Sequence, residues 1–412
     1  MTFIEHLKKY LNEEEIEKLV CSLELESKHA LLLNTQKMSA EKLLSIYPHL
    51  ERHPIVENAY LYNKSEYELG KSLLYELGVF YLQEPSAMLV SCLLNPKPNQ
   101  LVLDLCGAPG GKTVGASLLM KQTGLVVSND LSNQRAQIIK ENAERMGLCN
   151  LLIVSNDFSK IYKQYLNTFD AIILDAPCSG SGMFRKNDLM KQDWNINKVL
   201  KYASIQKELI LMCYQMLKEG GKLIYSTCSF SYEEDEEIIE HLLRETDAEI
   251  EPIENNPLFY VSRRGLGIHL FPYLFPGEGH YIALIKKPGI LKSRDEAKQV
   301  KKKYGPFTFL SQSSINMKNL NIIRDGVKLG EELHDDIKYD IHYARYINSF
   351  SQELEIDEKE AAAYLEGNSI NKDGYKGYIL LKYQGVPIDL AKGDGRIVKN
   401  RYPKYMRKKI PL

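Results

Sequence analysis

The sequence predicts an α/β protein built around a doubly wound, Rossmann-like parallel sheet, with a helical region before it and small mixed domains after it. Three observations support this fold class. Short apolar runs alternate with segments of helical length from about residue 102, the order that produces parallel sheets covered by helices. Those runs lack an every-second-residue alternation, so they suit strands buried on both faces. A glycine-rich loop directly follows the first run, where such folds bind ligands.

Length and composition narrow the class of protein. The chain has 412 residues, and 44% of them are hydrophobic. A single hydrophobic core rarely supports a chain of this length, so more than one domain is expected. The net charge of −1, taken over the whole chain, does not indicate nucleic-acid binding. The sequence contains no run of about 18 apolar residues, so no membrane span is predicted. The N-terminus lacks the basic-then-apolar pattern of a secretion signal, which favours the cytoplasm.

The first seventy or so residues read as short helices. Asn12 and Glu15 have the spacing of a capping box ahead of an apolar segment. A second polar-apolar segment covers residues 39–46. We therefore expect a helical N-terminal region.

The predicted sheet rests on five apolar runs that each close on a small or polar residue, or on cysteine. They cover residues 101–105, 125–128, 151–154, 171–174 and 222–225. Helical segments are predicted between them, for example over residues 132–146 and 197–217. The sheet is expected to close near residues 281–285.

The C-terminal part differs in composition. Residues 292–303 are rich in Lys and Arg and predict a linker or an exposed helix. Residues 378–383 read as a strand, followed by a turn at residues 385–387. The segment 375–412 holds ten Lys and Arg against two Asp, with tyrosines interleaved. Basic and aromatic side chains together suit RNA, and the alternative is a solvated surface with a few packed tyrosines.

The glycine-rich loop between the first predicted strand and helix is the strongest local signal. It ends in Gly-Lys-Thr, like a phosphate-binding loop, but that motif needs four residues between its first Gly and the Gly-Lys pair. Only three separate them here, and the internal proline removes an N–H group. A nucleotide triphosphate is therefore disfavoured. The loop residues expected to approach a ligand are Cys106, Gly107, Ala108, Pro109, Gly110, Gly111 and Lys112.

Three carboxylates follow successive predicted strands. Asp130 lies about twenty residues after the loop, a position that commonly grips a ribose hydroxyl. Asp157 and Asp175 follow the next two strands. Each could instead cap the following helix. Taken with the loop, the three acids favour an adenosine-bearing cofactor without a triphosphate.

Two of the seven cysteines stand at strand ends. No Cys-x-x-Cys pair is present, so neither a disulfide framework nor a metal site is predicted. Cys178 and Cys228 lie in loops rich in Gly, Ser and Pro after neighbouring predicted strands, where inert packing is a weaker explanation than function. Four others read as ordinary apolar cysteines, namely Cys21, Cys92, Cys149 and Cys213.

These motifs resemble the RsmF/NSUN-type RNA cytosine-5 methyltransferases. The resemblance rests on residues 175–180 around Cys178, on 227–229 around Cys228, and on the loop 106–112. Residues 83–88 and 277–283 resemble further segments of the family, and 385–404 resembles the PUA-like domain of its bacterial RsmF-type members. The resemblance implies a class I methyltransferase domain, S-adenosyl-L-methionine as cofactor and RNA as partner.

The resemblance also implies a division of roles. Carbon 5 of cytosine is a poor nucleophile, and a thiolate added at carbon 6 activates it. In the family that thiolate belongs to the residue matching Cys228, and Cys178 matches the group that releases the product. Asp175 would hold the cytosine edge, and Lys112 would favour the thiolate. The implied cofactor site comprises the loop 106–112, Asp130, Asp157 and Asp175, with Arg135 as a further contact; Arg185 and Lys186 would meet RNA phosphate.

The resulting division of the chain has four parts. Residues 1–75 would form a helical RNA-binding region, 76–288 the methyltransferase domain, 289–348 a linker with a first C-terminal domain, and 349–412 the PUA-like domain. The expected substrate is 16S ribosomal RNA, within the small subunit or free, with transfer RNA as the alternative. A monomer is expected. Two other functions stay open: a DNA methyltransferase that attacks through Cys178, and a non-catalytic RNA-binding module.

Overall fold

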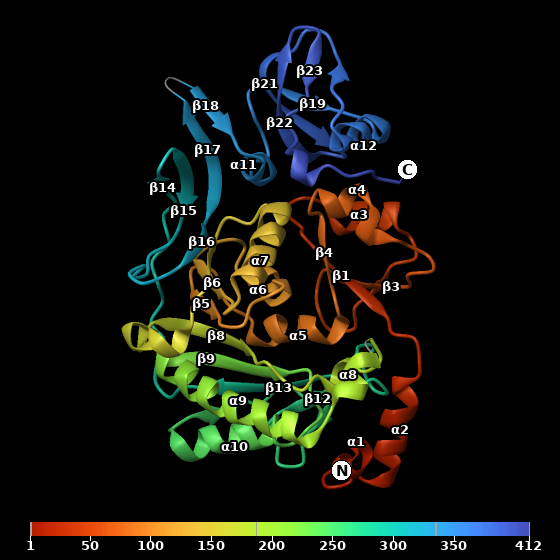
Figure 1. The fold of residues 1–412 in the computed structure, drawn as a ribbon, viewed down its shortest axis with the longest axis vertical. Coiled ribbons are helices and arrows are strands. Elements are labelled where there is room, and N and C mark those ends of the chain that lie inside the picture. Colours follow the sequence, from red (N-terminus) through yellow and green to blue (C-terminus); the bar gives the residue numbers. More distant parts are fainter. Residues whose placement is uncertain (1, 187, 334–335, 412) are drawn as a thin grey trace.

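A computed structural model describes residues 2–186, 188–333 and 336–411. Its strands form four sheets; in Figure 1 the N-terminal strands lie to the right of β5 and β6, and the C-terminal sheet lies at the top. The largest sheet has ten strands in the order β11-β12-β13-β9-β8-β5-β6-β7-β16, with β10 paired to β13. The predicted α/β class is therefore confirmed.

The centre of the large sheet is parallel. Neighbours β7-β6-β5-β8-β9 all pair in the same direction, and each of the five predicted runs lies in one of them. Strand β5 pairs with both β6 and β8, so the chain order reverses there and opens a crevice at the carboxyl ends. The antiparallel β13 closes the sheet against β9 where predicted. The bounds are β5 (Leu101–Asp104), β6 (Leu125–Asn129), β7 (Leu151–Val154), β8 (Phe169–Asp175), β9 (Leu217–Thr227), β10 (Glu249–Ile250), β11 (Tyr260–Val261), β12 (Ile268–Leu270) and β13 (His280–Lys286).

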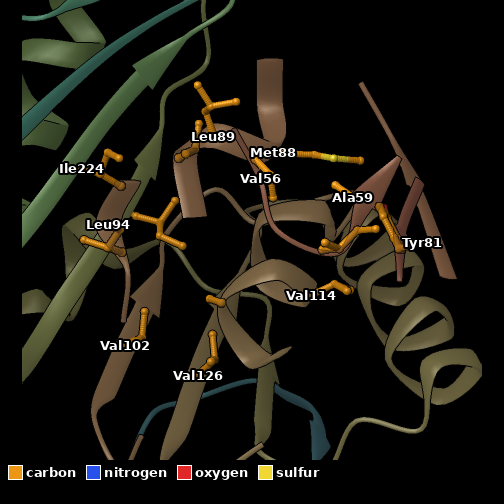
Figure 2. Packing of buried hydrophobic residues seen from close by; sticks show 14 of the residues in the cluster. Val56, Ala59, Tyr81, Met88, Leu89, Leu94, Val102, Val114, Val126 and Ile224 are labelled. Atoms are coloured by element: carbon orange, nitrogen blue, oxygen red, sulfur yellow. The ribbon is translucent and has the colours of Figure 1, made fainter. Parts of the chain in front are cut away.

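Helices cover both faces of this sheet. Alternate residues of one strand enter different hydrophobic clusters: Val102 packs with α5, α6 and α7, whereas Leu101 and Leu103 pack with α9 and α10. Figure 2 shows Val102 and Val126 directed toward Val114 of α6 and toward α5. Burial on both faces explains the continuous apolar runs. The helices are α5 (Pro85–Leu94), α6 (Gly111–Leu119), α7 (Asn133–Met146), α8 (Asp188–Asp193), α9 (Ile196–Met216) and α10 (Glu236–Glu245).

The N-terminal region is only partly helical. The capping box of Asn12 and Glu15 forms at the start of α2, and Ser39 caps α3. The expectation of helices alone is wrong, because residues 29–83 also build the sheet β2-β3-β1-β4. Strands β1 and β3 are short and buried almost without alternation, a pattern that does not separate strand from helix. The elements are α1 (Phe3–Leu7), α2 (Glu13–Leu23), β1 (His29–Leu33), α3 (Ala40–Ile46), β2 (Glu51–Arg52), β3 (Ala59–Tyr62), α4 (Leu73–Glu76) and β4 (Phe80–Gln83).

Beyond residue 288 the chain crosses back over the large sheet. The basic segment 292–303 contains no helix and runs into strand β14. Strand β16 pairs antiparallel with β7, so it adds an edge strand to the ten-stranded sheet. A separate sheet, β14-β15-β17-β18, forms beside it. The bounds are β14 (Val300–Tyr304), β15 (Phe307–Ser311), β16 (Ile322–Asp325), β17 (Val327–Leu333), β18 (Asp336–Tyr339) and α11 (Ile341–Tyr346).

The last sheet, β19-β21-β22-β23-β20, packs on the N-terminal sheet. One hydrophobic cluster joins Leu31 and Phe80 to Leu365, Ile379 and Ile410, and Figure 1 shows α3 and α4 beside this C-terminal domain. Among the tail tyrosines, Tyr402 is buried and Tyr405 is 82% exposed. The bounds are β19 (Glu353–Glu355), α12 (Glu358–Glu366), β20 (Ile370–Asn371), β21 (Lys376–Tyr383), β22 (Val386–Asp394) and β23 (Ile397–Lys399). Within the described residues, no helix has the length and apolarity needed to cross a membrane.

Candidate active site

The glycine-rich loop turns at the crevice where the strand order reverses. It leaves β5 at Asp104 and enters α6 at Gly111. A Cβ atom at Gly107 would lie 2.3 Å from Oγ of Ser128, so no larger residue fits there. Gly110 caps α6 with a φ of 113°, in the left-handed region that glycine tolerates. Both glycines therefore shape a backbone that a ligand can approach closely.

A cavity of about 870 Å³ opens beside this loop, and we call it the larger cavity. It is lined by Cys106, Ala108, Asp130, Arg135, Asp157 and Asp175 of the predicted cofactor residues. Gly107, Pro109, Gly111 and Lys112 line a neighbouring cavity instead, and Gly110 lines neither. Apolar side chains that the sequence did not single out complete the larger cavity, among them Leu131, Phe158 and Met212.

The acids of the larger cavity are held in different ways. Asp130 is 4% exposed, and its carboxylate pairs with Arg135 at 3.3 Å. Arg135 also donates to the carbonyl of Ala108 at 3.1 Å, which links the acid to the loop. Asp157 caps a short 3₁₀ turn through Ser159, so the capping alternative holds for this residue. The larger cavity combines carboxylates, apolar walls and a loop backbone that a ligand can approach closely. This combination fits an adenosine-bearing cofactor.

The two strand-end cysteines meet. Strands β8 and β9 are parallel neighbours, with Asp175 opposite Ser226. The Sγ atoms of Cys178 and Cys228 lie 3.0 Å apart. Cys228 lines both cavities, whereas Cys178 lines only the larger one. The structure therefore brings together two thiols that are fifty residues apart in the chain.

The surroundings of the two thiols differ. The contact with Cys228, together with burial, raises the pKa of Cys178 well above its usual range. The negative charges of Glu234 and Asp175 act in the same direction. Lys112 instead interacts electrostatically with Cys228. Burial also raises the pKa of Cys106, which keeps this third thiol protonated.

Lys112 and Asp175 form a half-buried ion pair at the wall between the two cavities. Nζ of Lys112 lies 2.7 Å from a carboxylate oxygen of Asp175. Burial alone would lower the pKa of Lys112, but Asp175 more than offsets it and the pKa is raised. Burial would likewise raise the pKa of Asp175, but Lys112 and His280 hold it below its usual value. Both groups are therefore charged at neutral pH.

A smaller cavity of about 480 Å³ lies on the other side of this wall. Its far side comes from the N-terminal sheet and its margin, through Lys28, Tyr62, Lys64 and Tyr81. His280 lies at its base, and burial, then Lys112, lower the pKa of its imidazole. None of these side chains was singled out from the sequence. Only His280 carried a signal, because it lies in the segment 277–283 that resembled the family.

Arg185 does not face solvent, contrary to the expectation that it meets phosphate. Its Nε donates to Glu278 at 2.9 Å and a second nitrogen donates to the carbonyl of Gly277 at 2.6 Å. These contacts tie the loop after Cys178 to the segment just before β13. Lys186 is exposed and lines the smaller cavity, so it remains placed for a phosphate.

Comparisons with known proteins cover almost the whole chain. Residues 91–286 match the family described as 16S rRNA methyltransferase RsmB/F. Residues 1–85 match the N-terminal domain of 16S rRNA methyltransferase RsmF, and residues 351–408 match the methyltransferase RsmF PUA domain. The segment between residues 286 and 351 lies outside these three matches.

Individual relatives agree with the family matches. The ribosomal RNA small subunit methyltransferase F of Vibrio parahaemolyticus is 30% identical over 91% of this chain and 90% of its own. A tRNA (cytosine(49)-C(5))-methyltransferase of Pyrococcus abyssi is 34% identical over 63% of this chain and 88% of its own. A crystal structure of a methyltransferase homologue from Pyrococcus horikoshii is 26% identical and superposes with a TM-score of 0.60, over 69% of this chain and 93% of its own. The chain therefore belongs to the RsmB/F family of 16S rRNA methyltransferases.

Proposed function

We propose that this protein is an RNA cytosine-5 methyltransferase that uses S-adenosyl-L-methionine and acts on 16S ribosomal RNA through a covalent cysteine–cytosine intermediate. The observation that supports this most directly is the contact of two thiols, Sγ to Sγ 3.0 Å, at the wall between two cavities. Cytosine methylation at carbon 5 needs a nucleophile and a proton acceptor on the same base. The family relationship favours RNA over DNA and an enzyme over a binding module.

Cys228 is the proposed nucleophile. It lines both cavities and interacts with the ammonium group of Lys112, and a nearby cation favours a thiolate. Addition of its sulfur to carbon 6 breaks the 5,6 double bond and makes carbon 5 nucleophilic. Asp175, held as a carboxylate by Lys112, accepts a hydrogen bond from the exocyclic amine of the base.

Cys178 is the proposed proton acceptor. Its pKa is raised first of all by the contact with Cys228. Once the sulfur of Cys228 is bonded to carbon 6, it is a thioether and a weak acceptor, so the hydrogen bond between the two cysteines, the largest cause of the raised pKa of Cys178, is weakened. After methyl transfer, Cys178 gives up its own proton to water and, as a thiolate, takes the proton from carbon 5, so that the double bond re-forms and Cys228 leaves as a thiolate.

S-adenosyl-L-methionine supplies the methyl group when bound. The larger cavity is its proposed site, with Asp130 for the ribose hydroxyls, Asp157 for the adenine and Asp175 beside the reacting end. The loop 106–112 lets backbone groups approach the cofactor, and Arg135 fixes Asp130 relative to that loop.

The remaining domains are proposed to hold RNA. Residues 1–75 and the PUA-like domain 349–412 flank the methyltransferase domain 76–288, and residues 289–348 connect them. The smaller cavity is the proposed cytosine pocket, because the N-terminal sheet and Lys186 bring cations to its rim. The protein would act as a monomer in the cytoplasm, on the small subunit or its free RNA.

A methylation assay tests this proposal. Protein and S-adenosyl-L-methionine are incubated with naked 16S rRNA, with small subunits lacking the modification, and with tRNA, and the products are mapped by bisulfite sequencing. One cytosine in 16S rRNA is expected to become fully protected from conversion. Methylation of tRNA alone would transfer the proposal to that substrate, and no new 5-methylcytosine in any arm would contradict it.

Removal of the Asp130 carboxylate is expected to weaken cofactor binding. A hydrogen bond to a charged group contributes about 1.5–3 kcal/mol, so Asp130→Ala is expected to raise the dissociation constant about 10- to 100-fold. Isothermal titration calorimetry with S-adenosyl-L-methionine measures this without RNA. Asp373→Ala removes an exposed acid remote in sequence and serves as the control. Equal affinities for both variants would contradict the assignment.

A further inference from the structure

Glu234 is a buried carboxylate directly behind the two reactive cysteines. It is 0% exposed, although it belongs to the acidic run 233–237 just after the Cys228 loop. Its side chain lines neither cavity. It therefore does not touch cofactor or base, and its burial needs another reason, because an isolated buried charge is costly.

The carboxylate bridges the two cysteine loops. One oxygen accepts from the backbone N–H of Ser179 at 2.8 Å, and the other accepts from the hydroxyls of Ser179 at 2.5 Å and Ser229 at 2.7 Å. Ser179 follows Cys178 and Ser229 follows Cys228. A single side chain thus holds the residue next to each thiol.

Gln206 of α9 completes this cluster. Its amide donates to Glu234 at 3.2 Å and to the carbonyl of Pro177, just before Cys178, at 2.8 Å. All four groups facing the carboxylate are donors, and an ionised carboxylate is a pure acceptor. Burial raises the pKa of Glu234, and the bonds from Ser179 and Ser229 act against that rise. The donor set matches the charged form.

We infer that Glu234 is a positioning residue that keeps the sulfur atoms of Cys178 and Cys228 in contact. The inference deepens the proposed function, since it concerns how the same two thiols are aligned. Beyond Glu234, the loops share backbone contacts, such as Gly182 N–H to the carbonyl of Cys228 at 2.8 Å. The carboxylate adds the link that lies directly next to both sulfurs.

The spacing of the thiols can be measured without RNA. Phenylarsine oxide binds two adjacent thiols at once: two S–H bonds and the As–O bond break, two As–S bonds form, and water leaves. Wild-type protein is expected to bind it tightly through Cys178 and Cys228. Glu234→Gln is expected to weaken this binding about tenfold or more, because an amide offers one acceptor oxygen where the carboxylate offered two.

Turnover gives the second readout. A misplacement of about 1 Å costs roughly 100-fold in rate, so Glu234→Gln is expected to lower kcat about 100-fold with cofactor affinity unchanged. Glu233→Gln is the matched control, since the neighbouring Glu233 is half-buried and pairs with His6 rather than with the cysteine loops. Cys178→Ala keeps only one of the two thiols, so it measures how tightly phenylarsine oxide binds to a single thiol.

Ser229→Ala covers the case in which Glu234→Gln does not fold. It removes one hydrogen bond to the carboxylate and keeps the charge, so a smaller loss of arsenical affinity and of kcat is expected. Wild-type arsenical affinity in a folded Glu234→Gln variant, or in Ser229→Ala when the first does not fold, would overturn the inference. Because this readout needs no RNA, it also stands apart from a failure of the proposed methylation.

Discussion

Cys228→Ala is expected to abolish methyl transfer, whereas Cys178→Ala is expected to trap the protein on its RNA. Loss of a catalytic nucleophile lowers turnover by at least about 10⁴-fold, and Cys106, the other cysteine that lines the smaller cavity, cannot replace it, because burial keeps that thiol protonated. Without Cys178 the base is still attacked and methylated, but its carbon-5 proton stays. The adduct then accumulates.

A denaturing gel distinguishes the two variants. Cys178→Ala, incubated with RNA and cofactor, is expected to give a slowly migrating protein–RNA band that ribonuclease removes, and Cys228→Ala is expected to give none. Cys21→Ser changes an exposed cysteine that lines neither cavity and serves as the control. An active Cys228→Ala variant together with an adduct-free Cys178→Ala variant would reverse the proposed roles.

Deletion of residues 290–412 is expected to destabilise the whole molecule, not only to remove an RNA-binding tail. The deletion takes β16 from the edge of the methyltransferase sheet and uncovers the apolar side chains that the N-terminal sheet shares with the C-terminal domain. Each large side chain uncovered costs about 1.5–3 kcal/mol. A total loss of about 5 kcal/mol lowers Tm by roughly 10–20 °C in a chain of this size class.

Calorimetry of the shortened chain checks this result, and an unchanged Tm would contradict it.

Substitutions at exposed tail positions separate RNA binding from stability. Lys404, Tyr405 and Lys409 are exposed, so their joint replacement by Ala is expected to keep Tm and cofactor affinity. RNA affinity is expected to fall, with the slope of log K against log salt shrinking by about 0.7 per lost phosphate contact.

The central sheet was predictable because its signals are local. Strands buried on both faces give continuous apolar runs, and the loop 106–112 marks the crevice directly. Because the two strands that precede them are parallel neighbours, Cys178 and Cys228 could be expected at the same carboxyl end of the sheet. Their contact distance could not, because it depends on loop conformation and on Glu234.

The features that the sequence did not reveal depend on long-range packing. Strands β1, β3 and β4 of the N-terminal sheet are short and mostly apolar, which suits helix or strand equally. Strand β16 pairs with β7 about 170 residues earlier in the chain. Residues 233–237 are five consecutive acids, a type of residue that is rarely buried, yet Glu234 and Asp235 are both fully buried. Local pattern does not reveal which members of a charged run turn inward.

The shared core of the two chain ends has a consequence for synthesis on the ribosome. Strand β4 ends at Gln83 and the C-terminal domain begins its sheet at Glu353. At about 5–20 residues per second, roughly 10–60 s of translation separate these partners. During that interval the nascent N-terminal sheet has an uncovered apolar surface, a natural target for chaperones. The methyltransferase domain, complete except for β16, is then expected to fold before the two ends of the chain close on each other.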